Sequence, residues 1–154
     1  MSKKPTATDA ELLLKLYDLR REAEMRKARH WWLVTFWPET ADDFMKVVSA
    51  MGTPENNWLR QASGYWSMAA SLALAGTVNQ ELFLEPSFSG EMFFIFAKVK
   101  PFLSDLRAKA KNPRMFANME KLINSSKASR EWLRHVEGQV AARRENMAKT
   151  AKAS

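Results

Sequence analysis

Residues 53–76 read TPENNWLRQASGYWSMAASLALAG, and this stretch decides the fold. Thr53 followed by Pro54 predicts a helix start, because threonine caps a free backbone N–H and proline suits the first helical position. Gly76 predicts the helix end, since glycine readily adopts the left-handed conformation that closes helices. Apolar side chains lie on nearly all sides of this helix, which is typical of the centre of a bundle: Trp58, Leu59, Ala62, Tyr65, Trp66, Met68, Ala69 and Leu72.

The segment on the N-terminal side predicts a long first helix over residues 9–37. Its apolar residues recur at helical spacings of three and four: Leu12, Leu16, Leu19 and Ala23. Thr8 or Asp9 is expected to cap it, and Pro38 ends it because proline lacks the backbone N–H and restricts the residue before it. A short second helix is expected over residues 41–51, with Thr40 and Asp43 as a capping box and Gly52 at its C-terminal end.

The segment on the C-terminal side predicts shorter pieces. Residues 77–90 indicate a short helix and a loop at Pro86, and a helix from Gly90 is expected to kink at Pro101. Asn112-Pro113 predicts the start of a final helix, in which Ser125, Ser126 and Ser129 favour a bend or break. We therefore expect an all-α, single-domain, irregular bundle of five to seven helices over residues 9–137. Residues 1–8 are expected to be disordered, and residues 138–154 to form a basic, fraying tail.

Composition fits one globular domain. The chain has 154 residues, 46% of them hydrophobic and 27% charged, with no cysteine. The absence of cysteine excludes disulfides and thiolate chemistry and fits a reducing, cytoplasmic setting. Lys15 interrupts the apolar run at residues 12–14, so no signal peptide is expected. Residues 62–78 carry no charge, but small and polar residues dilute them, which favours a core helix over a membrane span.

The sequence does not predict an enzyme. Its two histidines, His30 and His135, do not fit the common catalytic or metal-ligand spacings. No phosphate loop, dinucleotide fingerprint or nucleophile elbow is present. We therefore expect no catalytic residue, no metal site and no cofactor.

The first helix carries the first candidate site, a partner contact made of arginine next to tyrosine. Such residues are enriched at interface hot spots, because guanidinium groups stack on aromatic rings and bind carboxylates through two parallel hydrogen bonds. The candidate contact consists of Tyr17, Arg20, Arg21, Arg26 and Arg29. The alternative, which we favour, is that these arginines tie the first helix to acids of the same domain such as Glu81, Glu85 or Glu91.

Aromatic residues supply the second candidate site, a pocket for an apolar or cationic ligand. Its candidate lining is Trp31, Trp32, Trp58, Tyr65 and Trp66. Core packing is the alternative that we favour, because aromatic stripes at helical spacing usually lie inside.

The distribution of charge supplies the third candidate site. Residues 1–97 hold 10 Lys+Arg and 12 Asp+Glu, whereas residues 98–154 hold 14 and 5. This imbalance suggests a candidate contact with an anionic partner in the last third, made of Lys98, Lys100, Arg107, Lys109, Lys111, Arg114, Arg143 and Arg144. A solvated basic helix is the alternative that we favour, and nucleic-acid binding would be weak and salt-sensitive because no recognition motif appears.

Several short patterns together resemble a family of small bacterial proteins of unknown function that are predicted to be helical. They are Tyr17-x-x-Arg20-Arg21, Met25-Arg26-x-Ala28-Arg29, Tyr65-Trp66-Ser67-Met68-Ala69-Ala70, Gly76, Lys100-Pro101 and Leu106-Arg107, within residues 11–125. The resemblance implies a helical fold and carries no activity, cofactor or site residue.

The sequence thus favours a non-enzymatic protein–protein interaction or assembly module with an unknown protein partner or a second copy. An anionic-surface binder, acting on nucleic acid or phosphate, and a small-ligand binder with a tryptophan-lined pocket are the alternatives.

Overall fold

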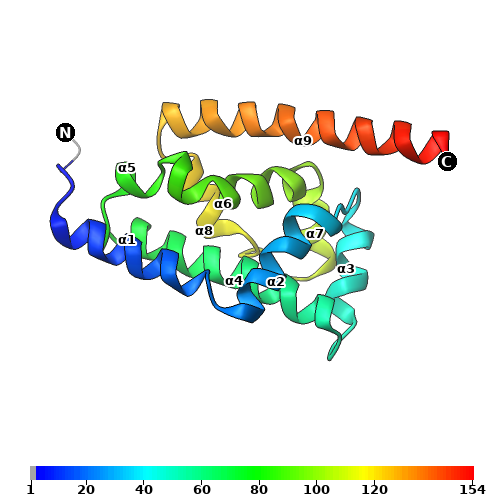
Figure 1. The fold of residues 1–154 in the computed structure, drawn as a ribbon, viewed down its shortest axis with the longest axis horizontal. Coiled ribbons are helices and arrows are strands. Elements are labelled where there is room, and N and C mark those ends of the chain that lie inside the picture. The colour runs from blue at the N-terminus through cyan, green and yellow to red at the C-terminus, as the bar shows by residue number, and fades with distance from the viewer. Residues whose placement is uncertain (1–2) are drawn as a thin grey trace.

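The computed structural model describes residues 3–154, which form an all-α bundle without strands, as the sequence predicts (Figure 1). The helical segments are α1 (Ala7–Leu19), α2 (Ala23–His30), the π-helix η1 (Trp31–Thr35), α3 (Ala41–Ser49), α4 (Pro54–Leu74), α5 (Gln80–Phe83), α6 (Pro86–Val99), the 3-10 helix η2 (Lys100–Phe102), α7 (Leu103–Lys109), α8 (Ala117–Ile123) and α9 (Lys127–Ala153).

Helix α4 occupies the centre, with α2, α3, α5, α8 and η1 packed against it. Thr53 accepts a hydrogen bond from the backbone N–H of Asn56 at 3.2 Å, Pro54 is the first helical residue, and Gly76 has a φ of 76°. The predicted start and end of this helix are therefore confirmed. The prediction that it is enclosed on nearly all sides is wrong, because Met68 and Leu72 are 47% and 37% exposed. No helix within residues 3–154 has the length and apolar character needed to cross a bilayer.

Helix α6 forms the second half of the core. Its buried apolar residues are Met92, Phe93, Ile95, Phe96, Ala97 and Val99. Helix α9 lies along α6 (Figure 1), and its inward face buries Leu133, Val136 and Val140. Each fully buried side chain of this size contributes roughly 1.5–3 kcal/mol of transfer free energy, so the α6–α9 pair is a main source of stability.

The predicted first helix is two helices joined by a turn. Helix α1 ends at Leu19, and Glu22 restarts the chain as the cap of α2 by accepting from the backbone N–H of Met25 at 2.9 Å. The N-cap of α1 is Thr6 rather than Thr8 or Asp9, although Asp9 completes a capping box with Thr6. The apolar periodicity continues through this break, which explains why the sequence predicted one helix.

Two prolines have the opposite roles from those predicted. Pro86 opens α6 instead of marking a loop, and Pro113 lies in a turn instead of opening a helix. Helix α8 begins only after Phe116, whose φ is 58°. The predicted break near Ser125 is confirmed, because Ser126 caps α9 by accepting from the backbone N–H of Ser129 at 3.1 Å.

Helices α1 and α9 include parts of both terminal segments of the chain. Of the segment 1–8 expected to be disordered, residues 1–2 lie outside the described residues, whereas Lys3 accepts a hydrogen bond from Asn79 and Thr6 caps α1. Residues 138–154, expected to fray, continue α9 to Ala153 without a boundary at 138. Val140 is buried there, so the packed face of α9 extends past the expected end of the domain.

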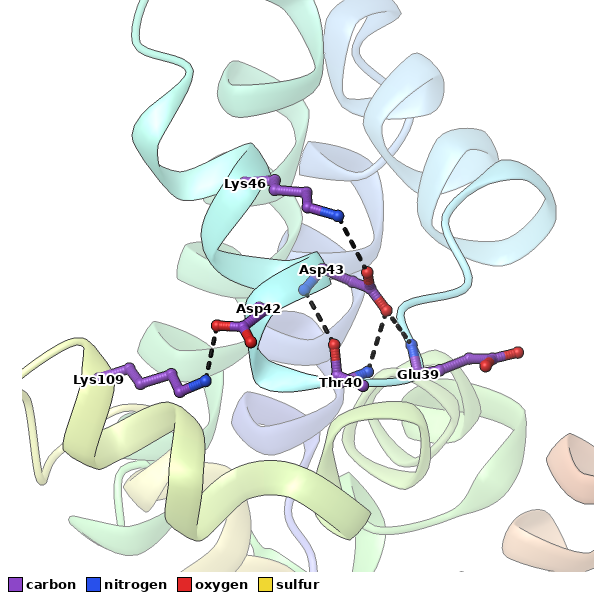
Figure 2. A network of polar contacts seen from close by, with 6 residues as sticks. All are labelled: Glu39, Thr40, Asp42, Asp43, Lys46 and Lys109. Carbon is purple, nitrogen blue, oxygen red and sulfur yellow. Dashed lines mark hydrogen bonds and ion pairs between the residues drawn. The ribbon is translucent and has the colours of Figure 1, made fainter.

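The capping box of α3 is present as predicted (Figure 2). Thr40 accepts from the backbone N–H of Asp43 at 3.2 Å, and Asp43 accepts from the backbone N–H groups of Glu39 and Thr40 at 3.1 Å each. The backbone N–H of Glu39 and the side chain and backbone of Thr40 lower the pKa of Asp43. Lys109 donates to Asp42 at 2.6 Å, which ties α7 to α3.

Replacing Thr40 with alanine is expected to lower the unfolding free energy by about 1 kcal/mol, because the N–H of Asp43 loses its acceptor. Chemical denaturation measures the change. Thr8→Ala is the matched control, since Thr8 is exposed and caps nothing. Equal stability of the two variants would contradict the role of the capping box.

Candidate functional site

Arg20, the first candidate contact on the N-terminal helices, is buried. Only 4% of it is exposed, and its guanidinium carbon lies 4.9 Å from the ring centre of Tyr17 and 5.1 Å from those of Trp66 and Phe88. Its Nη1 donates to the carbonyl of Phe88 at 3.0 Å. Burial lowers the pKa of the guanidinium. Arg20 therefore joins α1 to α6 and is not the surface contact that the sequence suggested.

Arg29 is held by an acid of the same domain. Its Nε donates to Glu91 at 2.6 Å, and the Glu91 side chain is only 5% exposed. The indole N–H of Trp66 donates to the other oxygen of Glu91 at 2.8 Å. The favoured alternative for this candidate contact is confirmed for Arg29, with Glu91 as the acid. We call Arg20, Arg29, Trp66, Phe88 and Glu91 the buried arginine cluster.

The remaining members of the candidate contact, Tyr17, Arg21 and Arg26, are exposed. Tyr17 and Arg26 border two different surfaces. Tyr17 borders a groove of about 450 Å³ between α1 and the α5–α6 corner, together with Leu14, Leu82 and Phe88. Arg26 borders a separate depression between α2 and α4. The single Arg/Tyr surface that the sequence suggested is therefore not formed.

The five candidate pocket residues divide between two packed clusters. Trp31 stacks on Phe36 with ring centres 4.3 Å apart and lies 5.9 Å from Trp32 and 6.4 Å from Trp58. Tyr65 and Trp66 pack edge to face at 5.1 Å in the other cluster. Trp32 and Trp66 are fully buried, so the favoured alternative of core packing is confirmed for these two residues. Trp31 and Trp58 border an open depression.

Tyr65 joins α4 to α1. Its hydroxyl donates to the carbonyl of Leu16 at 2.5 Å. Burial is the main cause that raises the pKa of Tyr65 to about 12. Its phenol is therefore a structural donor and is not placed to bind a ligand.

Lys98, the first residue of the candidate anion contact, is fully buried. Its Nζ donates to the carbonyl of Trp32 at 2.6 Å and to that of Phe36, and it lies 4.0 Å from the ring centre of Trp37. It thus satisfies carbonyls at the end of η1, which no following helical turn can reach. Burial, followed by the charges of Arg144 and Arg143, lowers the pKa of Lys98 to about 7. Lys98 is a core residue and cannot contact an anionic partner.

Most of the other candidate anion residues are engaged within the domain. Lys100, Arg107 and Lys109 form ion pairs at 2.6 Å with Glu137, Glu120 and Asp42. Arg143 and Arg144 lie over the ring of Trp37 at 5.3 and 5.6 Å, and Arg144 donates to the carbonyl of Pro38 at 2.8 Å. Lys111 and Arg114 are exposed. Lys100, Arg107 and Lys111 do border one depression of about 570 Å³, but two of these cations are already paired.

The chain matches the domain of unknown function DUF4760 over residues 5–126. The chain belongs to the DUF4760 family. No curated protein and no solved structure gives a significant match to it.

The DUF4760 match ends at the turn before α9, so it includes the buried arginine cluster, the α1 groove and the depression between α2 and α4. Arg143 and Arg144 lie beyond it. DUF4760 is a family of unknown function, so the match brings no activity or ligand to these sites. Within residues 3–154 no group of three or more His, Cys, Asp or Glu residues is arranged to hold a metal ion.

Sequence reasoning missed two features of these sites. The groove residues Leu14, Leu82 and Phe88 were not singled out, because exposure of an apolar residue depends on what packs beside its helix. The burial of Lys98 did have a signal, since it interrupts the apolar run at residues 92–99. A cation inside such a run must be desolvated together with its neighbours.

Proposed function

We propose that this DUF4760 chain is a non-enzymatic assembly module that forms a symmetric dimer through α1. The observation that carries the proposal is an exposed apolar stripe at helical spacing, Ala10, Leu14 and Tyr17. Leu14 is 68% exposed and Tyr17 is 48% exposed. Large apolar side chains that gather on one exposed helix face are typical of interaction surfaces.

The groove beside α1 supports the same surface. Leu82 and Phe88 continue the apolar stripe from α1 onto the α5–α6 corner, around a space of about 450 Å³. The ring of Phe88 is fixed from below by Arg20, whose guanidinium lies 5.1 Å from its centre. The groove is therefore formed in advance, which lowers the entropy cost of receiving a side chain such as Leu14 of a second copy.

Charge on α1 favours a second copy in antiparallel orientation. Glu11 lies toward the N-terminal end of the stripe and Arg21 just beyond its C-terminal end, and neither makes an ion pair within residues 3–154. A twofold axis between Leu14 and Tyr17 places Glu11 of each copy opposite Arg21 of the other. Such an isologous pairing uses the same patch twice, as symmetric dimers do.

Sedimentation equilibrium of the full chain over a wide concentration range tests the dimer. Wild-type protein is expected to associate, and Leu14→Asp is expected to weaken association by on the order of 10-fold or more, because a buried unpaired carboxylate costs at least 1–3 kcal/mol. Met51→Asp is the matched control, since Met51 is 69% exposed and lies in the α3–α4 turn. A wild-type chain that stays monomeric throughout contradicts the proposal.

A charge exchange tests the antiparallel geometry without touching the apolar residues. Glu11→Arg and Arg21→Glu are each expected to weaken association, and the double variant is expected to restore it. Failure of the double variant to restore association would contradict the antiparallel pairing, even if the chain dimerises.

A further inference from the structure

A second open site lies between the α2–η1 segment and the first turns of α4. The depression has a volume of about 680 Å³. Its apolar side includes Trp31 and Trp58, whose ring centres are 6.4 Å apart and whose planes are tilted by 49°. Trp31 is held in place by stacking on Phe36. Trp31 is only 6% exposed, so the partly buried indole of Trp58 forms most of the apolar surface that a flat ligand can lie against, and Trp31 borders it.

The site lies at an irregular point of the backbone. Trp31 is the first residue of the π-helix η1, where the backbone N–H of Phe36 donates to the carbonyl of Trp31 at 2.8 Å. Such wide turns are rare and often occur at functional sites. Lys98 supports this turn from inside by donating to the carbonyls of Trp32 and Phe36. The wall of the depression is thus built on backbone that the core itself stabilises.

The polar rim of the depression carries one exposed guanidinium, that of Arg26, whose charge also acts on Glu22 one helical turn before it. Arg26, Lys27 and His30 border the depression on α2, and Lys27 is paired with Glu24 at 2.6 Å. The exposed side chains of Arg26 and His30 have no hydrogen-bond or ion-pair partner within residues 3–154. Arg26 therefore offers a planar donor pair at the edge of an indole wall.

We propose that this depression binds a small aromatic carboxylate. The ring of the ligand lies against Trp31 and Trp58, and its carboxylate accepts from the guanidinium of Arg26. A guanidinium holds a carboxylate with two parallel hydrogen bonds, which fixes the orientation of the ligand as well as its charge. Glu55 borders the depression from α4 and repels a carboxylate there, so the carboxylate of the ligand lies on the α2 side next to Arg26. This inference does not depend on the proposed dimer.

Titration of the full chain with 2-naphthoate tests the proposal. Binding is followed in ¹H–¹⁵N spectra through the indole N–H signal of Trp58, which is assigned with Trp58→Phe. The neutral 2-naphthamide has the same ring system without the charge and is expected to bind at least 10-fold more weakly, the loss of a charge-assisted hydrogen bond. Equal binding of the two probes, or a signal of Trp58 that does not move with 2-naphthoate, overturns the proposal.

Two variants locate the carboxylate. Arg26→Gln is expected to weaken 2-naphthoate binding by on the order of 10-fold, whereas Arg114→Gln, at another exposed arginine, is expected to leave it unchanged. Unchanged thermal unfolding of Arg26→Gln shows that the loss concerns the ligand. Leu14→Asp is expected to bind 2-naphthoate like the wild type, which separates this site from the dimer surface. Equal affinity of Arg26→Gln and Arg114→Gln overturns the assignment to Arg26.

Discussion

The unfolding free energy of the wild type is expected to rise by roughly 4 kcal/mol relative to Lys98→Met as the pH increases from 7 to 10. Lys98 is fully buried, and its pKa is lowered from 10.5 to about 7, mainly by burial. Between these two values the unfolded chain binds a proton at Lys98 that the folded chain does not. Stability contributed by this residue therefore increases with pH in that window, and below pH 7 both states are protonated and the slope disappears.

Chemical denaturation at several pH values between 7 and 10 measures the difference. Lys100→Met is the matched control, because Lys100 is exposed and paired with Glu137, so its difference from the wild type should stay nearly flat. The pKa of Tyr65 is raised to about 12, so its contribution to the unfolding free energy decreases only as the pH rises above 10. This decrease is the same in every variant and cancels in the comparison. A flat difference between the wild type and Lys98→Met would show that the amine of Lys98 is hydrated.

Sequence signals were reliable where a local motif fixes the backbone by itself. The Thr53-Pro54 start of α4, the Thr40–Asp43 capping box of α3 and the kink at Pro101 all occur as predicted. Each depends on hydrogen bonds or proline geometry within four residues, so distant parts of the chain do not alter it. The all-α class follows from the sum of such signals.

Sequence signals failed where the same residues allow two local outcomes. Proline opens a helix at Pro86 but lies in a turn at Pro113, and both follow a residue that can precede either structure. Apolar spacing likewise continues through the turn at residues 20–22, because α1 and α2 both bury a face against the same core. Tertiary packing decides these cases.

In the candidate sites, too, local motifs were predictable and the effects of tertiary packing were not. A basic residue in the sequence is a candidate contact until its neighbours in space are known, and packing makes Arg20 and Lys98 internal while leaving Arg21 and Arg26 exposed. The groove between α1 and the α5–α6 corner joins residues about 70 positions apart, so no local pattern indicates it. Two outcomes were predicted: the pairing of the first helix with an internal acid such as Glu91, from the need to satisfy a partly buried charge, and the core packing of Trp32 and Trp66.

Replacing Glu91 with glutamine is expected to lower the unfolding free energy by about 3 kcal/mol, because the partly buried guanidinium of Arg29 loses the carboxylate with which it pairs and the buried guanidinium of Arg20 loses a nearby negative charge. Glu91 accepts from Arg29 at 2.6 Å and from the indole N–H of Trp66 at 2.8 Å, and its side chain is 5% exposed. Glutamine keeps the size of the side chain and an acceptor for Trp66, so the change removes mainly the charge. The midpoint of chemical denaturation measures the loss.

Glu137→Gln is the matched control, since its ion pair with Lys100 has the same length of 2.6 Å but is partly exposed on both sides. An exposed pair contributes at most about 1 kcal/mol, because water screens it. Adding Arg29→Met to Glu91→Gln is expected to recover part of the loss, because one of the unpaired charges is then removed as well. If Glu91→Gln costs no more than Glu137→Gln, water reaches the buried arginine cluster, and the fixed position of Phe88 in the dimer groove loses its physical basis.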